Sequence, residues 1–144
     1  MRVLFTVLLL SLGGAFAQTY AGGKVGGNNL LLGLGVSDTV DVRFDADAFL
    51  SGDISRFDLG ADVLVGVPGS TDEVDFYAGG GPSIGYTSVS GDGEFDVYLQ
   101  GLGGAEYSAV AEKLGLFGEV GLQSRLTNSF AIYPFFQTGF NFYF

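Results

Sequence analysis

The residues of this chain that can do chemistry are mainly carboxylates, and many of them occur at every second position. The sequence holds 16 Asp and Glu residues against 6 Lys and Arg, and it contains no His and no Cys. Carboxylates grouped on one surface can attract cations, bind a divalent metal through oxygen ligands, or do acid–base work. Ten charged residues lie on the polar side of alternating segments and are our candidate site residues: Asp41, Arg43, Asp45, Asp47, Arg56, Asp58, Asp62, Asp75, Asp96 and Glu119.

Catalysis and metal binding have the weakest support among these chemistries. The absence of His removes the commonest general base and the commonest metal ligand. A pair such as Asp45 and Asp58 would be left to do acid–base work, and the acids show no recognised metal-loop spacing. We therefore predict no catalytic residue, no metal site and no cofactor, and we expect the protein not to be an enzyme.

The elements that must position these residues are β-strands with two different faces. From Val40 to Phe49 the even positions are apolar and the odd positions before Phe49 are charged. Such strict period-two alternation suits a strand, whereas a helix would scatter the charges around its circumference. Residues 57–67 repeat the alternation with opposite parity, so an even-length loop within 50–53 puts both apolar rows on one side.

The length of that loop decides which charges meet across the two strands. A two-residue loop is expected to place Arg56 opposite Asp47, and a four-residue loop to place Arg43 opposite Asp62. Either register forms a cross-strand ion pair on the polar face.

Six further segments bring the number of expected strands to eight. They are residues 20–25, 30–36, 74–86, 95–100, 116–123 and 130–144, and Pro82 weakens the third of them because proline cannot donate to a sheet. Residues 87–94 are expected to form a loop, and 108–114 a connecting helical turn. A tilted membrane strand takes about 10 residues. Eight such strands with short turns between them match the length of residues 18–144. We therefore predict an all-β fold, an eight-stranded antiparallel up-and-down transmembrane β-barrel.

Residues 1–17 are expected to be a secretory signal peptide, which leaves 18–144 as the barrel domain. Arg2 supplies a basic start, and an apolar run follows from Val3 to Leu12. This run is shorter than the roughly 20 residues of a membrane helix. Ala15-Phe16-Ala17 is a small-x-small cleavage pattern.

A soluble β-sandwich shows similar alternation and is the alternative fold. Two features favour the membrane barrel: the export signal, and the confinement of charge to the polar faces of the best-defined strands. In lipid that confinement is enforced, because a charge at mid-depth on the lipid face costs roughly 2–4 kcal/mol.

The last eight residues provide a third feature. They contain a polar residue, a glycine two positions on, and two hydrophobic residues spaced by two, the last one aromatic: Gln137, Gly139, Phe142 and Phe144. With this motif and eight strands, residues 18–144 resemble the small outer-membrane barrels of the OmpA/OmpX/Opa type. The resemblance implies a place in the cell outer membrane, contact with outer-membrane lipid, and recognition of the motif by the barrel-assembly machinery. The chain departs from such barrels in its short expected surface loops, which argues against an adhesin or receptor role.

The predicted function follows from the size and charge of the interior. The side chains of an eight-stranded barrel just fill it, so we expect a structural, envelope-anchoring protein with a polar, acidic and hydrated lumen. Two alternatives remain: a narrow cation-preferring pore, and a secreted soluble β-sandwich binding module. The net charge of −10 indicates that the protein has no basic surface on which nucleic acid could bind. We expect a monomer.

Overall fold

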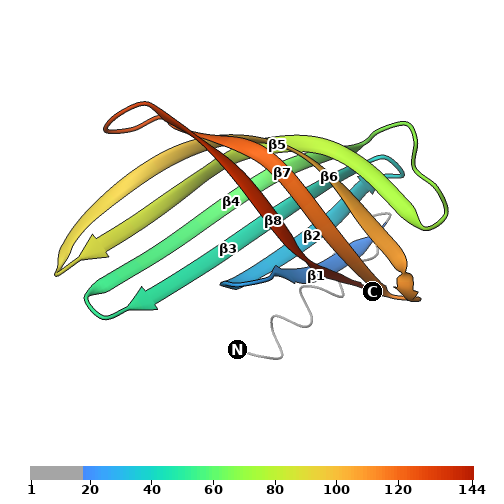
Figure 1. The fold of residues 1–144 in the computed structure, drawn as a ribbon, viewed down its shortest axis with the longest axis horizontal. Helices are drawn as coiled ribbons and strands as arrows, with labels where there is room; N and C mark the ends of the chain where they lie inside the picture. The colour runs from blue at the N-terminus through green and yellow to red at the C-terminus, as the bar shows by residue number, and fades with distance from the viewer. Residues whose placement is uncertain (1–17) are drawn as a thin grey trace.

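The computed structural model describes residues 18–144, which form one sheet of eight antiparallel strands closed into a barrel (Figure 1). Each strand pairs with the next along the chain, and the first pairs with the last. The strands are β1 (Thr19–Lys24), β2 (Asn28–Ser37), β3 (Val40–Ser51), β4 (Ile54–Gly66), β5 (Val74–Val89), β6 (Asp92–Ala111), β7 (Leu114–Arg125) and β8 (Ala131–Tyr143). The predicted fold class is confirmed, and the sandwich alternative is wrong because a single sheet closes on itself.

The predicted signal peptide falls on residues 1–17, which lie outside the described residues. Within residues 18–144, no helical segment has the length and apolar character needed to cross a membrane.

Several connections are tighter than the sequence analysis predicted. The expected loop 87–94 is a two-residue turn, Ser90-Gly91, in which both residues have positive φ, as two-residue hairpin turns often require. The expected helical turn at 108–114 is also wrong. β6 continues to Ala111 because its pairing with β7 resumes at Ala111 and Leu114 after an irregularity that begins at Tyr107.

The β3–β4 hairpin adopts the register in which Arg43 lies opposite Asp62. The turn consists of Gly52 and Asp53 alone. The register is thus one of the two expected, but the four-residue loop assigned to it was wrong. Arg56 lies opposite Phe49 rather than Asp47.

A glycine run, Gly79-Gly80-Gly81, lies very close to the backbone of β4. A Cβ on Gly81 would lie 1.8 Å from the carbonyl oxygen of Ala61, and one on Gly79 would lie 2.1 Å from that of Val63. The two backbones therefore approach more closely than any side chain allows. Pro82 follows this run without ending β5, since its pairing with β6 is unbroken from Val74 to Val89. Figure 1 shows β5 and β6 curving together across the barrel.

The two faces of the barrel wall have opposite polarity. All Asp, Glu, Lys and Arg residues of the described strands occupy inward-facing positions of the register. The outward positions carry exposed apolar side chains, such as Leu59 on β4, Val120 on β7 and Phe136 on β8, which are 65%, 60% and 72% exposed. The molecule is thus polar inside and apolar outside, the reverse of a water-soluble barrel.

The close approach of β5 and β4 can be tested with Gly81→Ala. We expect this variant to lose about 1–3 kcal/mol of folding free energy, as overpacked sites typically do, because the added methyl group meets fixed backbone. The loss would be measured by urea unfolding of the purified protein in detergent or lipid vesicles. Gly101→Ala on β6 is the matched control, since a Cβ there has no neighbour within 4 Å. Equal stability of the two variants would contradict the close approach.

Candidate functional site

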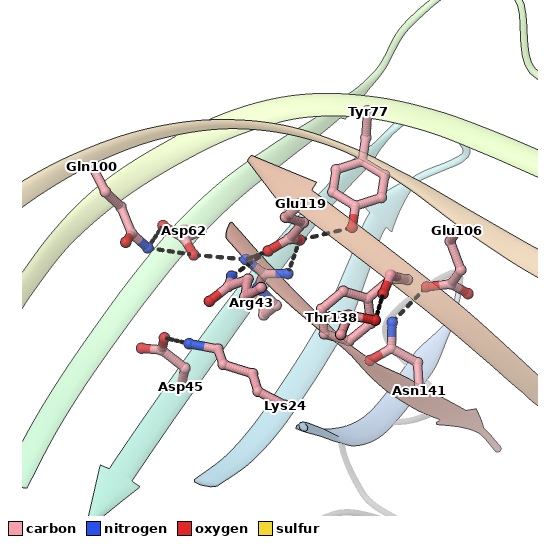
Figure 2. A network of polar contacts seen from close by, with 12 residues as sticks. Lys24, Arg43, Asp45, Asp62, Tyr77, Gln100, Glu106, Glu119, Thr138 and Asn141 are labelled. Carbon is pink, nitrogen blue, oxygen red and sulfur yellow. Dashed lines mark hydrogen bonds and ion pairs between the residues drawn. The ribbon is translucent and has the colours of Figure 1, made fainter. Parts of the chain in front are cut away.

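A buried ion cluster lies in the middle of the lumen, with Arg43 of β3 at its centre (Figure 2). The guanidinium donates from Nη1 to Glu119 of β7 at 2.5 Å and from Nη2 to Asp62 of β4 at 3.0 Å. All three side chains are almost completely buried, with Arg43 only 1% exposed. Buried charges are stable only when they are paired and their remaining hydrogen-bonding capacity is used, so the surrounding groups matter as much as the ion pairs.

Neutral side chains from three other strands donate further hydrogen bonds to both carboxylates. Gln100 of β6 donates to both oxygens of Asp62, at 2.8 and 3.0 Å. The hydroxyl of Tyr77 on β5 donates to Glu119 at 2.7 Å, and the side-chain amide of Gln137 on β8 donates to the other oxygen of Glu119. Each of the strands β3 to β8 thus contributes one residue to what we call the central cluster: Arg43, Asp62, Tyr77, Gln100, Glu119 and Gln137.

Large side chains from β1 and β2 occupy the lumen beside the cluster. Tyr20 and Leu31 are both buried. The Tyr20 ring lies against Gly33, where a Cβ would stand 1.9 Å from a ring carbon. With these residues, the cluster occupies the narrow interior expected of an eight-stranded barrel.

The other predicted site residues are dispersed along the lumen. Asp45 pairs at 2.7 Å with Lys24, a residue that the sequence analysis did not single out. Asp58 pairs with Arg56 of its own strand at 2.7 Å. Because each of these acids has its own cation, they do not form the shared acid–base pair considered from the sequence. Asp96 instead accepts hydrogen bonds from the β7–β8 loop, from Thr127 and Asn128.

Glu106 is a buried lumen residue that the sequence analysis assigned to a connection. It lies on β6 and accepts hydrogen bonds from Asn141 and Tyr143 of β8. The signal was present, because every second residue from Asp96 onward faces inward and Glu106 keeps that parity. The glycines between them hid the alternation.

The C-terminal motif has structural roles in the barrel wall. Gln137 belongs to the central cluster, and Gly139 leaves room for the ring of Phe117, since a Cβ there would lie 2.5 Å from that ring. Phe142 and Phe144 are exposed. Recognition of this motif by an assembly machinery stays a prediction.

A cavity of about 650 Å³ occupies the lumen between the central cluster and the barrel end at which Gln18 and Phe144, the first and last described residues, lie. Arg43 and Tyr77 form its inner end, and the β2–β3 turn and the β4–β5 loop border its mouth. We call it the termini-side vestibule. Its wall includes Asp41, Asp75, Glu106, Asn141 and Tyr143. Among the described residues, no three carboxylates converge closely enough to hold a metal ion.

Comparison with solved structures finds the same architecture. Neisserial surface protein A is 17% identical with a TM-score of 0.57, and 88% of this chain aligns with 92% of that chain. The N-terminal β-barrel domain of Pseudomonas aeruginosa OprF is 13% identical with a TM-score of 0.61, covering 88% and 94%. The attachment invasion locus protein Ail of Yersinia pestis is 12% identical with a TM-score of 0.48, covering 88% and 93%. No protein-family model and no curated protein sequence matches the chain. At these identities the first two matches establish the fold, a small eight-stranded barrel.

The energetic weight of the central cluster can be tested with Arg43→Met. This substitution leaves Glu119 and Asp62 buried without their cation, and breaking a buried pair in this way typically costs about 3–5 kcal/mol. We expect a destabilisation of that size in urea unfolding. Adding Glu119→Gln and Asp62→Asn should recover most of it, because no charge then stays unpaired.

Arg56→Met is the control for Arg43→Met. The Arg56–Asp58 pair is much more exposed than the central cluster, with side chains that are 46% and 24% exposed, and exposed pairs contribute about 0–1 kcal/mol. If Arg56→Met and Arg43→Met cost the same, the cluster does not carry the stability assigned to it.

Proposed function

We propose that this protein is a small outer-membrane β-barrel that anchors in the envelope and whose lumen is sealed by the central cluster. The observation that carries the proposal is the reversed polarity of the wall, with charge inside and apolar side chains outside. Export through a cleaved signal peptide at residues 1–17, and assembly through Gln137, Gly139, Phe142 and Phe144, belong to the same proposal. Both are predictions from the sequence.

A bilayer is the environment that suits the outer face. Soluble monomers rarely expose contiguous apolar patches of more than a few hundred Å², whereas exposed apolar side chains cover the outward positions of this barrel. Membrane barrels carry an apolar band about 25 Å tall. Strands β2 to β8 have 10 to 20 residues each, and about 9–11 tilted residues cross a bilayer.

The interior supports a sealed barrel rather than the narrow pore considered from the sequence. Arg43 crosses from β3 to β7, and its two carboxylate partners take further donors from β5, β6 and β8. A continuous ion path would have to displace this bonded layer. We therefore expect no single-channel steps when the purified protein is added to a planar lipid bilayer.

Cell fractionation followed by electrophoresis of boiled and unboiled samples tests the proposal. We expect the protein in the outer-membrane fraction, with a faster band before boiling because a closed barrel keeps its compact shape. A protein that is soluble without detergent and migrates equally in both samples would refute the proposal.

The location of the outer face in lipid can be tested with Leu59→Arg. Leu59 lies within β4 on the outer face and is 65% exposed. In a bilayer we expect a cost of roughly 2–4 kcal/mol, measured by urea unfolding of vesicle-folded protein. Leu126→Arg in the β7–β8 loop is the control, since Leu126 is similarly exposed at 54% but lies beyond the strands. If the outer face meets water, neither substitution should be costly.

A further inference from the structure

Strand β1 is too short to cross a bilayer, so the barrel wall is recessed at the β1–β2 turn. β1 has six residues, Thr19–Lys24, whereas a tilted membrane strand takes about 9–11. Its pairing with β8 ends at Gly139, and that of β2 with β3 ends at Ala48. Both neighbours continue further, and Figure 1 shows the β3–β4 and β7–β8 turns extending well past the β1–β2 turn. We call the opening between residues 131–137 of β8 and 49–51 of β3 the lateral recess.

One edge of β8 is open along this recess. Even-numbered residues of β8 direct their backbone groups toward β1, since the carbonyl oxygen of Thr138 accepts from the backbone N–H of Val25 at 2.7 Å. The register of β8 with β7 is uninterrupted over residues 131–142, so the preceding even-numbered residues face the same way. They are Ile132, Pro134 and Phe136. No strand of the described chain pairs with them on that side.

Pro134 adapts the open edge to stay unpaired. Proline has no N–H, and within sheets it is confined to edges, to strand starts and to bulges. Its nitrogen lies on the open side of β8, in the middle of the recess. A strand that docked there would meet a missing donor, so the edge is poorly suited to another β-strand, whether from a second copy or from a different protein.

The floor of the recess is apolar. The β1–β2 connection, Val25-Gly26-Gly27, is the one connection between the described strands that carries no polar side chain. Val25 is 72% exposed. The hairpin end is closed by Asn29, whose amide nitrogen donates to the carbonyl oxygen of Lys24 at 3.3 Å and whose Oδ1 accepts from the Lys24 backbone N–H. Exposed turns in water usually carry Asn, Asp or Ser, so this composition indicates hydrocarbon over the turn.

A groove of about 680 Å³ crosses the wall at the same place. On the outer face it runs over the small residues of β3, where Ala46 lies between Leu30 of β2 and Leu59 of β4. Its outer lining is apolar: Leu30, Ala46, Ala48, Phe57 and Leu59. Its inner lining includes residues that face the lumen: Asn29, Asp47 and Asp58. The recess is therefore open from the outer face to the interior.

Aromatic side chains lie on the lumen side of the open β8 edge. The ring of Phe135 lies over Gly121, and Tyr133 occupies an inward-facing position of the same strand. Tyr133 is nevertheless 44% exposed, whereas the inward-facing rings of Tyr20 and Phe117 are buried. Apolar surface inside the barrel is thus left uncovered beside the opening. Within a bilayer, acyl chains are the component that covers such surface.

We propose that the lateral recess binds a lipid of the surrounding bilayer, whose acyl chain passes over the β1–β2 turn and contacts Tyr133 and Phe135. Unpaired backbone N–H groups are costly in lipid, and the ester oxygens of such a lipid can accept from those of Ile132 and Phe136. This inference rests on the proposed function, because the recess meets lipid only if the barrel lies in a bilayer.

Quenching of tryptophan emission by brominated lipid tests the proposal. The chain contains no Trp, so a single introduced tryptophan reports on one position. Three variants are folded into phosphatidylcholine vesicles with and without bromine on the acyl chains: Tyr133→Trp at the recess, Tyr98→Trp within the closed wall, and Phe136→Trp on the outer face. Tyr98 also faces inward, but it is paired on both sides, with Ser83 of β5 and Arg125 of β7. It therefore provides the matched control.

We expect brominated lipid to quench the emission of Tyr133→Trp nearly as strongly as that of Phe136→Trp, and that of Tyr98→Trp only weakly. Equally weak quenching of Tyr133→Trp and Tyr98→Trp would overturn the proposal. Quenching of Tyr133→Trp by aqueous iodide but not by brominated lipid would also overturn it, because the recess would then hold water. If even Phe136→Trp escapes brominated lipid, the barrel does not lie in the bilayer and the proposed function itself is wrong.

A second test hydrates the floor of the recess in the Tyr133→Trp protein. Val25→Asp should abolish most of the quenching by brominated lipid, because a charged turn excludes the acyl chain. Leu126→Asp in the β7–β8 loop is the control and should leave the quenching unchanged. Folding of each variant is checked by the mobility of unboiled samples, and Val25→Ser replaces Val25→Asp if the charged variant does not fold. Equal quenching in the Val25 and Leu126 variants would contradict the passage of the chain over this turn.

Discussion

The structure depends on one constraint, the burial of the Arg43 guanidinium at the centre of a narrow eight-stranded barrel. A charge at that place is stable only when carboxylates reach it and when each carboxylate finds further donors. Asp62 and Glu119 meet the first need, and Gln100, Tyr77 and Gln137 meet the second. Since a one-residue slip moves every side chain of a strand to the other face, this network ties together the registers of β3 to β8. A slipped strand would place a charge on the apolar outer face and leave its partner unpaired.

Glycine makes room for this network in a narrow interior. Large inward side chains face glycines on a neighbouring strand: Tyr20 lies over Gly33, Tyr77 over Gly104, Phe117 at Gly139 and Phe135 at Gly121. A Cβ at any of these glycines would approach the facing ring within 2.7 Å. An eight-stranded barrel holds about one layer of side chains, so a bulky residue requires a partner of minimal size. At these four places an inward-facing ring and an inward-facing glycine therefore depend on each other.

Period-two alternation was enough to predict the strands and their inward faces, because it requires only local backbone geometry. Both strands of the β3–β4 hairpin were correctly placed. Their acidic residues all occupy inward-facing positions: Asp41, Asp45, Asp47, Asp58 and Asp62. The pairing of Arg43 with Glu119 was beyond such reasoning, since it joins residues that are 76 positions apart and depends on how the closed sheet staggers around the barrel. Glu106 was missed because glycines interrupt the visible pattern of β6. The turn at Ser90-Gly91 was missed because the small and acidic residues between Ser88 and Glu94 suggested a loop, although most of them belong to the ends of two long strands.

The most direct test of the account is the accessibility of spin labels on β7 in lipid vesicles. The chain contains no Cys, so single cysteines can be introduced at Val120, Leu122 and Gln123 and labelled without a background. Labels at Val120 and Leu122 should collide with oxygen dissolved in lipid and be shielded from a water-soluble nickel complex. The label at Gln123, which faces the lumen, should not show this lipid signature. Equal exposure of all three labels to the nickel complex would contradict a barrel that holds its charges inside and its apolar face in the bilayer.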